Sequence, residues 1–278
     1  MIRRLMSIVL LLASALSAHA EVRDLGNGIQ LDGQFVQGGM VIGKAPPGSR
    51  IQFQQRDLAL SGDGVFAFGF GRDDKSPQTL KVTLPGQAAA TLNVAVAPRE
   101  YAIQKITGVP ARTVNPDPKD MARIEKEQSA VVRAREVVNS NIFFTEQFIW
   151  PVKGPVTGVY GSQRIYNGEP RSPHFGVDLA APRGATIVAP ADGVVTMAYP
   201  DMFFSGDTIV IDHGMGINTT YLHMSKMLVK QGDVVKQGQP IGKVGSSGRA
   251  TGPHLCWRLN WFQSRLDPQL IMATPKPE

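Results

Sequence analysis

The stretch Gly252-Pro-His-Leu-Cys-Trp-Arg-Leu259 alternates polar and apolar side chains at every second position. This period is that of a β-strand with one buried face. The apolar positions, expected on the core side of a sheet, are Leu255, Trp257 and Leu259. The polar positions, expected on the opposite side, are His254, Cys256 and Arg258. The stretch therefore predicts a β domain with a histidine beside a thiol on its polar face.

Two other segments have the same even spacing. On a strand, His174 and Asp178 of His174-Phe-Gly-Val-Asp178 share one face, and Gly176 leaves space between them. A histidine and a carboxylate on one face are half of a zinc site. Tyr221-Leu-His223 is a third pair, with both polar members expected on one face. One such pair is usually an ordinary hydrogen-bonded histidine, but three pairs hold most of the scarce metal-capable residues and indicate a site.

The composition and the many glycine and proline residues extend the prediction of a β protein to the whole chain. The 278 residues are 42% hydrophobic with 29 Gly and 20 Pro, which excludes disorder and favours many short strands joined by turns. Residues 21–98 alternate over short runs and predict a β-sandwich-like accessory domain. Residues 99–147 form a linker with an amphipathic helix near 119–138, and residues 148–278 return to strands and turns.

Residues 1–20 are predicted to be an export signal. Arg3 and Arg4 precede an apolar run from Leu5 to Leu16, and Ala18-His-Ala20 is an A-x-A cleavage site. No other segment is long enough to span a membrane, so we expect a soluble, Sec-exported protein. One cysteine cannot form an internal disulfide, so Cys256 is either an inert buried thiol or a functional one. The net charge of +6 is diffuse and lacks a basic cluster with interleaved aromatics, which argues against nucleic-acid binding.

Five motifs follow one another between about Trp150 and Pro268, and they read Pro173-His-Phe-Gly-Val-Asp178, Ala189-Pro-Ala-Asp-Gly193, Asp212-His-Gly214 with Tyr221-Leu-His223, Gln231-Gly-Asp-Val-Val-Lys-Gln-Gly238, and Thr251-Gly-Pro-His-Leu-Cys256. In this order they resemble the lysostaphin- or LytM-type zinc endopeptidases, which cleave peptide bonds in bacterial peptidoglycan. The resemblance implies a β-rich peptidase domain of the duplicated hybrid motif type. The upstream region also resembles the accessory region of some exported members.

The resemblance also implies roles for individual residues. His174 and Asp178 would bind Zn²⁺. His223 and His254 would be the catalytic histidines, one accepting a proton from the attacking water and the other steadying the developing oxyanion. Which histidine has which role stays open. Groove-wall positions are expected at Tyr160, Tyr166, Arg171, Phe203 and Phe204.

Cys256 departs from the family pattern, which has a third zinc-binding histidine at this place in His-x-His. A thiolate is a good zinc ligand, so a His-Asp-Cys centre is one reading. Alternatively, the site is degenerate and the domain binds peptidoglycan or activates a cell-wall amidase without cutting. An inert thiol and a Cys–His nucleophile are further alternatives, although the latter leaves His174 and Asp178 unexplained.

A biotinyl- or lipoyl-type carrier domain is a further alternative. Val188–Val195 and Gln231–Gly242 resemble the two half-motifs of those domains, but no lysine in 188–242 has the required setting. The sequence thus predicts a mainly β protein with a linking helix and a lysostaphin-type domain. It is expected to be a periplasmic or extracellular zinc metalloendopeptidase acting on peptidoglycan, with an amidase or regulator as a further partner.

Overall fold

The computed structural model describes residues 21–272. It is built mainly of β-strands with one long helix, so the predicted fold class is confirmed. The predicted signal peptide, residues 1–20, lies outside the described residues. Within 21–272, no helix is both long and apolar enough to cross a membrane.

Residues 21–97 contain two antiparallel sheets of four strands each. The first has the order β1 (Glu21–Gly26), β2 (Ile29–Gly33), β3 (Met40–Lys44) and β6 (Val65–Gly69). The second has the order β5 (Arg56–Asp57), β4 (Arg50–Phe53), β7 (Gln78–Thr83) and β8 (Ala90–Val94). Alternate residues of both sheets enter one aromatic-rich core, where the rings of Phe53 and Phe68 lie 4.5 Å apart.

The linker forms one strand, a short and a long α-helix, and two 3₁₀ turns. Strand β9 (Ile103–Ile106) lies parallel to β11 (Gln163–Tyr166), which pairs with β12 (Glu169–Pro170). A short α1 (Ala111–Val114) and a 3₁₀ turn (Pro118–Asp120) lead into α2 (Met121–Arg135). Helix α2 ends three residues before the predicted 138, and the side chain of Glu136 contacts Arg56 and Gln263 instead. A further 3₁₀ turn (Phe143–Thr145) follows.

Ten strands form the C-terminal sheet. Its main path is β10 (Val156–Gly158), β13 (Val177–Ala180), β20 (His254–Trp261), β17 (Ile217–Met227), β16 (Gly206–Gly214), β15 (Gly193–Met202) and β18 (Val234–Val235). Beside it, β14 (Thr186–Val188) pairs with β19 (Pro240–Val244), β19 pairs with β17, and β21 (Ser264–Leu266) pairs with β20; a 3₁₀ turn (Pro268–Ile271) ends the described chain. The core-facing side of β20 carries Leu255, Trp257 and Leu259, all fully buried, as the alternation predicted.

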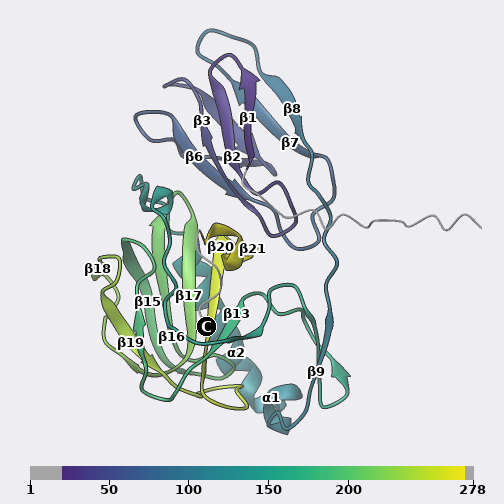
Figure 1. Cartoon of the computed structure of the whole chain (residues 1–278), viewed down its shortest axis with the longest axis vertical. Coiled ribbons are helices and arrows are strands. Elements are labelled where there is room, and N and C mark those ends of the chain that lie inside the picture. Colours follow the sequence, from purple (N-terminus) through teal and green to yellow (C-terminus); the bar gives the residue numbers. More distant parts are fainter. Residues whose placement is uncertain (1–20, 273–278) are drawn as a thin grey trace, which may run out of the picture.

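The two β units share a hydrophobic core. Figure 1 shows the N-terminal sheets above the C-terminal sheet, with the linker running down one side to α1 and α2. Trp261, Phe262 and Leu266, near the ends of β20 and β21, belong to the core of the N-terminal sheets. The ring of Trp261 lies 5.6 Å from that of Phe53. Burial of these aromatic and aliphatic side chains therefore ties the units together.

Candidate metal centre

The pairing of β13 with β20 places two of the predicted metal ligands opposite each other. Asp178 is the register partner of Cys256, and Leu222 of β17 pairs with Cys256 from the other side. Directly paired residues of an antiparallel sheet project to the same face. Asp178 and Cys256 therefore lie side by side on the face opposite the Leu255–Trp257 core, although 78 residues separate them in the chain.

His174 reaches this pair from a loop. The strand predicted for 174–178 begins only at Val177, so His174 and Asp178 are not brought together by strand alternation. Instead the His174 backbone is held by hydrogen bonds with Gly161 and Ser162. Gly176 does not provide space between ligands either, because a Cβ there would lie 2.6 Å from the carbonyl oxygen of Trp257. This glycine allows the loop to approach β20.

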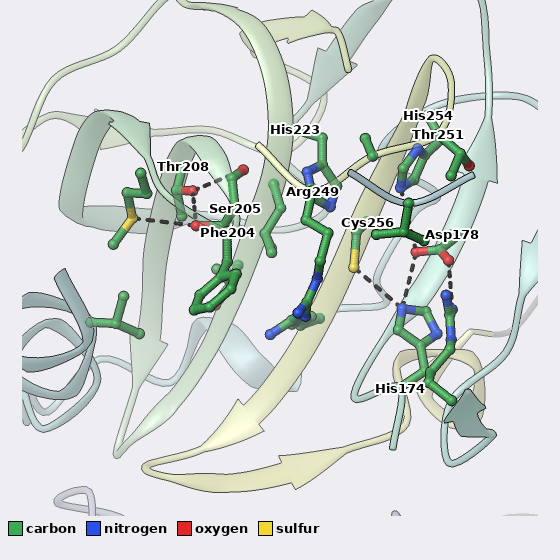
Figure 2. Close-up of a pocket in the computed structure, with 18 of the residues that line it drawn as sticks. His174, Asp178, Phe204, Ser205, Thr208, His223, Arg249, Thr251, His254 and Cys256 are labelled. Carbon is green, nitrogen blue, oxygen red and sulfur yellow. Dashed lines mark hydrogen bonds and ion pairs between the residues drawn. The ribbon is translucent and has the colours of Figure 1, made fainter. Parts of the chain in front are cut away.

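A nitrogen, an oxygen and a sulfur atom that could each bind a metal ion meet at this point. His174 Nε2 lies 3.0 Å from Asp178 Oδ1 and 3.4 Å from Cys256 Sγ, and all three donors are within 4.8 Å of one another. Figure 2 shows both contacts converging on the His174 ring. His174 Nδ1 lies 3.2 Å from the carbonyl oxygen of Val159, so Nδ1 carries the proton and donates it. Nε2 is thereby the ring nitrogen that faces Asp178 and Cys256.

Arg164, which sequence reasoning did not select, completes the surroundings of Asp178. Its Nη2 donates to Asp178 Oδ2 at 2.8 Å, and both side chains are buried. Arg164 lies on β11, between the sequence motifs, and no periodic signal in the sequence marked it. The pair fixes one carboxylate oxygen and leaves Oδ1 turned toward His174.

The charges of these groups shift their pKa values in opposite directions. Burial disfavours the charged form of His174, but Asp178 and Cys256 outweigh it and raise the His174 pKa to about 9. Burial would raise the pKa of Asp178, yet His174 and Arg164 hold it well below its usual range. Asp178 is therefore an anion surrounded by groups that stabilise its charge.

The two histidines predicted to be catalytic lie together beside this cluster. The rings of His223 and His254 are 4.8 Å apart, and His254 Nε2 is 3.9 Å from Asp178 Oδ1. Each directs Nδ1 at a backbone carbonyl, His223 at Ser247 (2.8 Å) and His254 at Gly252 (2.9 Å). All three histidines of the cluster thus donate from Nδ1 to a backbone carbonyl. Burial, and then the charge of His254, lower the His223 pKa to about 3.

An irregularity in β17 turns His223 toward the cavity. Strand alternation predicted that Tyr221 and His223 share a face, but Tyr221 is buried in the core of the sheet. The pairing of β17 with β16 gains an extra residue between Tyr221 and Met224, and His223 has φ +65°. A non-glycine residue in this conformation costs about 1–3 kcal/mol. The fold therefore supports backbone strain at a residue that lines the cavity.

All five clustered residues line one cavity of about 690 Å³. Tyr166 and Phe204 of the predicted groove wall also line it, whereas Arg171 and Phe203 do not. Tyr160 does not line the cavity, because its side chain is buried (2% exposed) and its hydroxyl donates to the carbonyl oxygen of Arg265. Helix α2 contributes an unforeseen part of the lining, from Ile124 to Arg135.

His213 is separate from this cavity. It is fully buried at the end of β16, where its Nδ1 and Nε2 contact the carbonyl oxygen of Asp192 at 2.7 Å and the hydroxyl of Thr219 at 2.8 Å. Burial lowers its pKa to about 4. Both nitrogens are used in holding strands together.

Comparison with known proteins gives the class of this site. Residues 172–268 match the model of peptidase family M23, and the match contains His174, Asp178, His223, His254 and Cys256. Residues 172–268 therefore form a peptidase M23 domain. Arg164 and helix α2 lie outside the matched residues.

Relatives and a solved structure agree with an M23 domain in this part of the chain. The peptidoglycan DD-endopeptidase ShyA of Vibrio cholerae is 47% identical over 90 residues, which cover 32% of this chain and 20% of that protein. The DD-carboxypeptidase/endopeptidase Mpg of Neisseria meningitidis is 39% identical over 109 residues, covering 38% and 24%. The chain thus spans about a fifth to a quarter of these relatives' lengths. A crystal structure of a candidate M23 peptidase from Pseudomonas aeruginosa superposes with a TM-score of 0.66 at 29% identity, covering 86% of this chain and 95% of that one.

Proposed function

We propose that this protein is a zinc-dependent endopeptidase that uses its M23 domain to hydrolyse peptide bonds of peptidoglycan. The observation that carries the proposal is the common orientation of the three histidines. His174, His223 and His254 each donate from Nδ1 to a backbone carbonyl, so Nε2 is the ring nitrogen directed at the other residues of the site. This state suits one metal ligand and two proton-accepting groups in a single cavity.

The three donors fit zinc in both chemistry and spacing. Imidazole, carboxylate and thiolate are the ligands that zinc takes in proteins, and three protein ligands leave a position open for chemistry. Zinc–ligand bonds of about 2.0–2.3 Å at tetrahedral angles separate neighbouring donors by about 3.3–3.6 Å. The separations of 3.0 and 3.4 Å from His174 Nε2 need little adjustment. When bound, zinc acts as a Lewis acid that polarises the substrate carbonyl and makes water a better nucleophile.

The remaining groups move and hold protons. His254 accepts the proton of the attacking water, because positive charge on its ring faces the Asp178 carboxylate. His223 stays neutral, since burial and the neighbouring His254 oppose its charge. Its Nε2 accepts a hydrogen bond from the substrate or the water and orients it. Arg164 keeps the Asp178 carboxylate ionised and in place.

The substrate assignment rests on the Vibrio cholerae relatives, whose names state that they are peptidoglycan DD-endopeptidases. Because peptidoglycan lies outside the cytoplasmic membrane, we also propose that the protein acts in the periplasm or outside the cell.

Elemental analysis tests the proposal together with digestion of peptidoglycan. We expect close to one zinc per wild-type chain, a large loss of zinc in Cys256→Ala, and new muropeptides from the wild type alone. His213→Gln is the matched control, because it changes a buried histidine outside the donor set and is expected to keep its zinc. Absence of both zinc and digestion would contradict the proposal and favour a peptidoglycan-binding module that activates a cell-wall amidase.

One contact supports a second candidate, a metal-independent Cys–His hydrolase. Cys256 Sγ lies 3.4 Å from His174 Nε2, within reach of proton transfer. Cys256 is only 2% exposed, which restricts its access to a substrate carbonyl. Activity that survives a zinc chelator but is lost on alkylation with iodoacetamide would favour this candidate over the zinc enzyme.

A further inference from the structure

The cavity holds more positive charge than its carboxylates balance. Five arginines line it, namely Arg135, Arg164, Arg249, Arg258 and Arg265, against the two carboxylates of Glu127 and Asp178. Asp178 is paired with Arg164, and Glu127 accepts from Arg123 and from the backbone N–H of Phe203. Among residues 21–272, the other four arginines form no ion pair within 4.0 Å. This excess of cationic groups indicates an anionic ligand.

Arg135 is the most deeply buried of these four. It is 2% exposed, and its Nη2 donates to Thr220 Oγ1 at 3.2 Å. Its Nε and Nη1 are also buried, and they find no hydrogen-bond partner among the described residues. The adjacent Glu136 is not available, because it pairs with Arg56 at 3.0 Å and accepts from Gln263 at 3.0 Å. These bonds also hold the end of α2 in place.

Two further arginines lie near Arg135 on the sheet. Thr220, its hydrogen-bond partner, is the register partner of Arg258, so Arg258 projects to the same face. Thr220 Oγ1 also accepts from Asn260, whose side-chain oxygen accepts from Arg265 Nη1 at 2.9 Å. The Nε of Arg258 is likewise buried without a partner among the described residues.

An uncompensated buried guanidinium is costly, and this cost is recovered when a ligand supplies the opposite charge. The planar fork of arginine matches a carboxylate through two parallel hydrogen bonds. A volume of about 690 Å³ is within the range that holds a peptide fragment beside the metal centre. Peptidoglycan stem peptides carry free carboxylates, and a carboxylate is the anion that a peptide substrate brings.

We propose that Arg135, with Arg258 and Arg265, forms a subsite that binds a free carboxylate of the peptide substrate, at a distance from the bond that is cut. The proposal rests on the proposed function and adds a substrate requirement to it. Arg135 comes from α2, outside the residues that match the M23 model, so the linker of this chain supplies part of the specificity.

The test compares a soluble cross-linked muropeptide dimer with the same dimer after conversion of its carboxylates to carboxamides. We expect the wild type to prefer the native dimer at least about tenfold in kcat/KM. Arg135→Met should lose this preference through a higher KM, with kcat nearly unchanged. The control is Arg133→Met, which removes an exposed charge two residues earlier on the same helix and should behave like the wild type.

Calorimetric binding of both dimers to chelator-treated protein separates the two proposals. If the wild type and Arg135→Met each cleave the native and the carboxamide dimer at equal rates, the subsite proposal is refuted and the peptidase proposal stands. Binding that needs both Arg135 and the carboxylates, without any cleavage, would support the subsite and refute the peptidase. Inorganic phosphate that binds as tightly as the native dimer, and through Arg135, would overturn the assignment to a carboxylate.

Folding of the variants is checked by thermal melting. Removing a buried charge with unpartnered N–H groups is not expected to lower Tm. If Arg135→Met does not fold, Arg258→Met takes its place, because Arg258 reaches the same subsite from β20. The same loss of preference is then expected, and an unchanged preference would refute the subsite.

Discussion

Gly158→Ala probes how the centre is held together. Gly158 is in β10, opposite Asp178 on β13, and a Cβ there would lie 2.3 Å from Asp178 Oδ2 and 2.8 Å from Arg164 Nη2. Its φ lies outside the left-handed region, so alanine adds a steric contact and no backbone strain. The carboxylate must retreat by about 1 Å to restore an ordinary contact, whereas zinc–ligand distances vary by only about 0.2 Å.

The displacement has two expected consequences. Separating the buried pair of Arg164 and Asp178 weakens a charge-assisted hydrogen bond, which is worth about 1.5–3 kcal/mol of unfolding free energy. Misplacing a ligand and its hydrogen-bonded neighbour should lower zinc affinity by about 10–100-fold. A competing chelator measures the affinity, and urea unfolding of the metal-free protein measures the stability.

Gly62→Ala is the matched control for this change. An added Cβ at Gly62 meets no atom within 4 Å, and its φ is also outside the left-handed region. We expect unchanged zinc affinity and a stability change of at most about 1 kcal/mol. If Gly158→Ala binds zinc within threefold of the wild type and unfolds at the same urea concentration, then Gly158 does not govern the position of the Asp178 carboxylate.

Three further changes test other parts of the structure. His213 has a folded-state pKa of about 4 against an ordinary 6.5, so on acidification the unfolded state binds the proton first. The free energy of unfolding should therefore fall by about 3 kcal/mol between pH 6.5 and pH 4. Urea unfolding of His213→Gln should depend less on pH, and parallel curves for the variant and the wild type would contradict this. Trp261→Ala should cost about 3–5 kcal/mol and weaken both β units in one transition, because the ring packs on Phe53; a loss below 1 kcal/mol by urea unfolding would argue against a shared core. Cys256→His replaces a thiolate by a neutral imidazole, leaving more positive charge on zinc, so the acidic limb of the pH–rate profile should move to lower pH; an unchanged profile would exclude Cys256 as a ligand.

Local pattern was sufficient to predict the fold class. The alternation around Cys256 predicted both faces of β20, and the charged segment near 119–138 predicted α2 to within three residues of each end. These elements follow from short-range periodicity, which any sheet or helix of that sequence must satisfy. The ordered motifs then indicated which residues belong to one site, because they carry most of the chain's histidines.

Tertiary structure decided how those residues meet. His174 lies in a loop and reaches Asp178 through hydrogen bonds to Gly161 and Ser162, contacts that spacing does not encode. The bulge at His223 overrides the strand period, because an extra residue in β17 reverses the side-chain direction beyond it.

The arginines of the cavity show the same division. Arg164 and Arg135 lie 14 and 43 residues before Asp178, on elements whose packing brings them to the sheet. In the sequence alone, no motif distinguishes Arg164 or Arg135 from other charged residues. Only the structure shows that they are buried, and burying a guanidinium away from water costs free energy unless a partner supplies the opposite charge. The sequence by itself determined the fold class, strand β20 and helix α2, and the tertiary structure decided which charges of the described residues were paired and which were not.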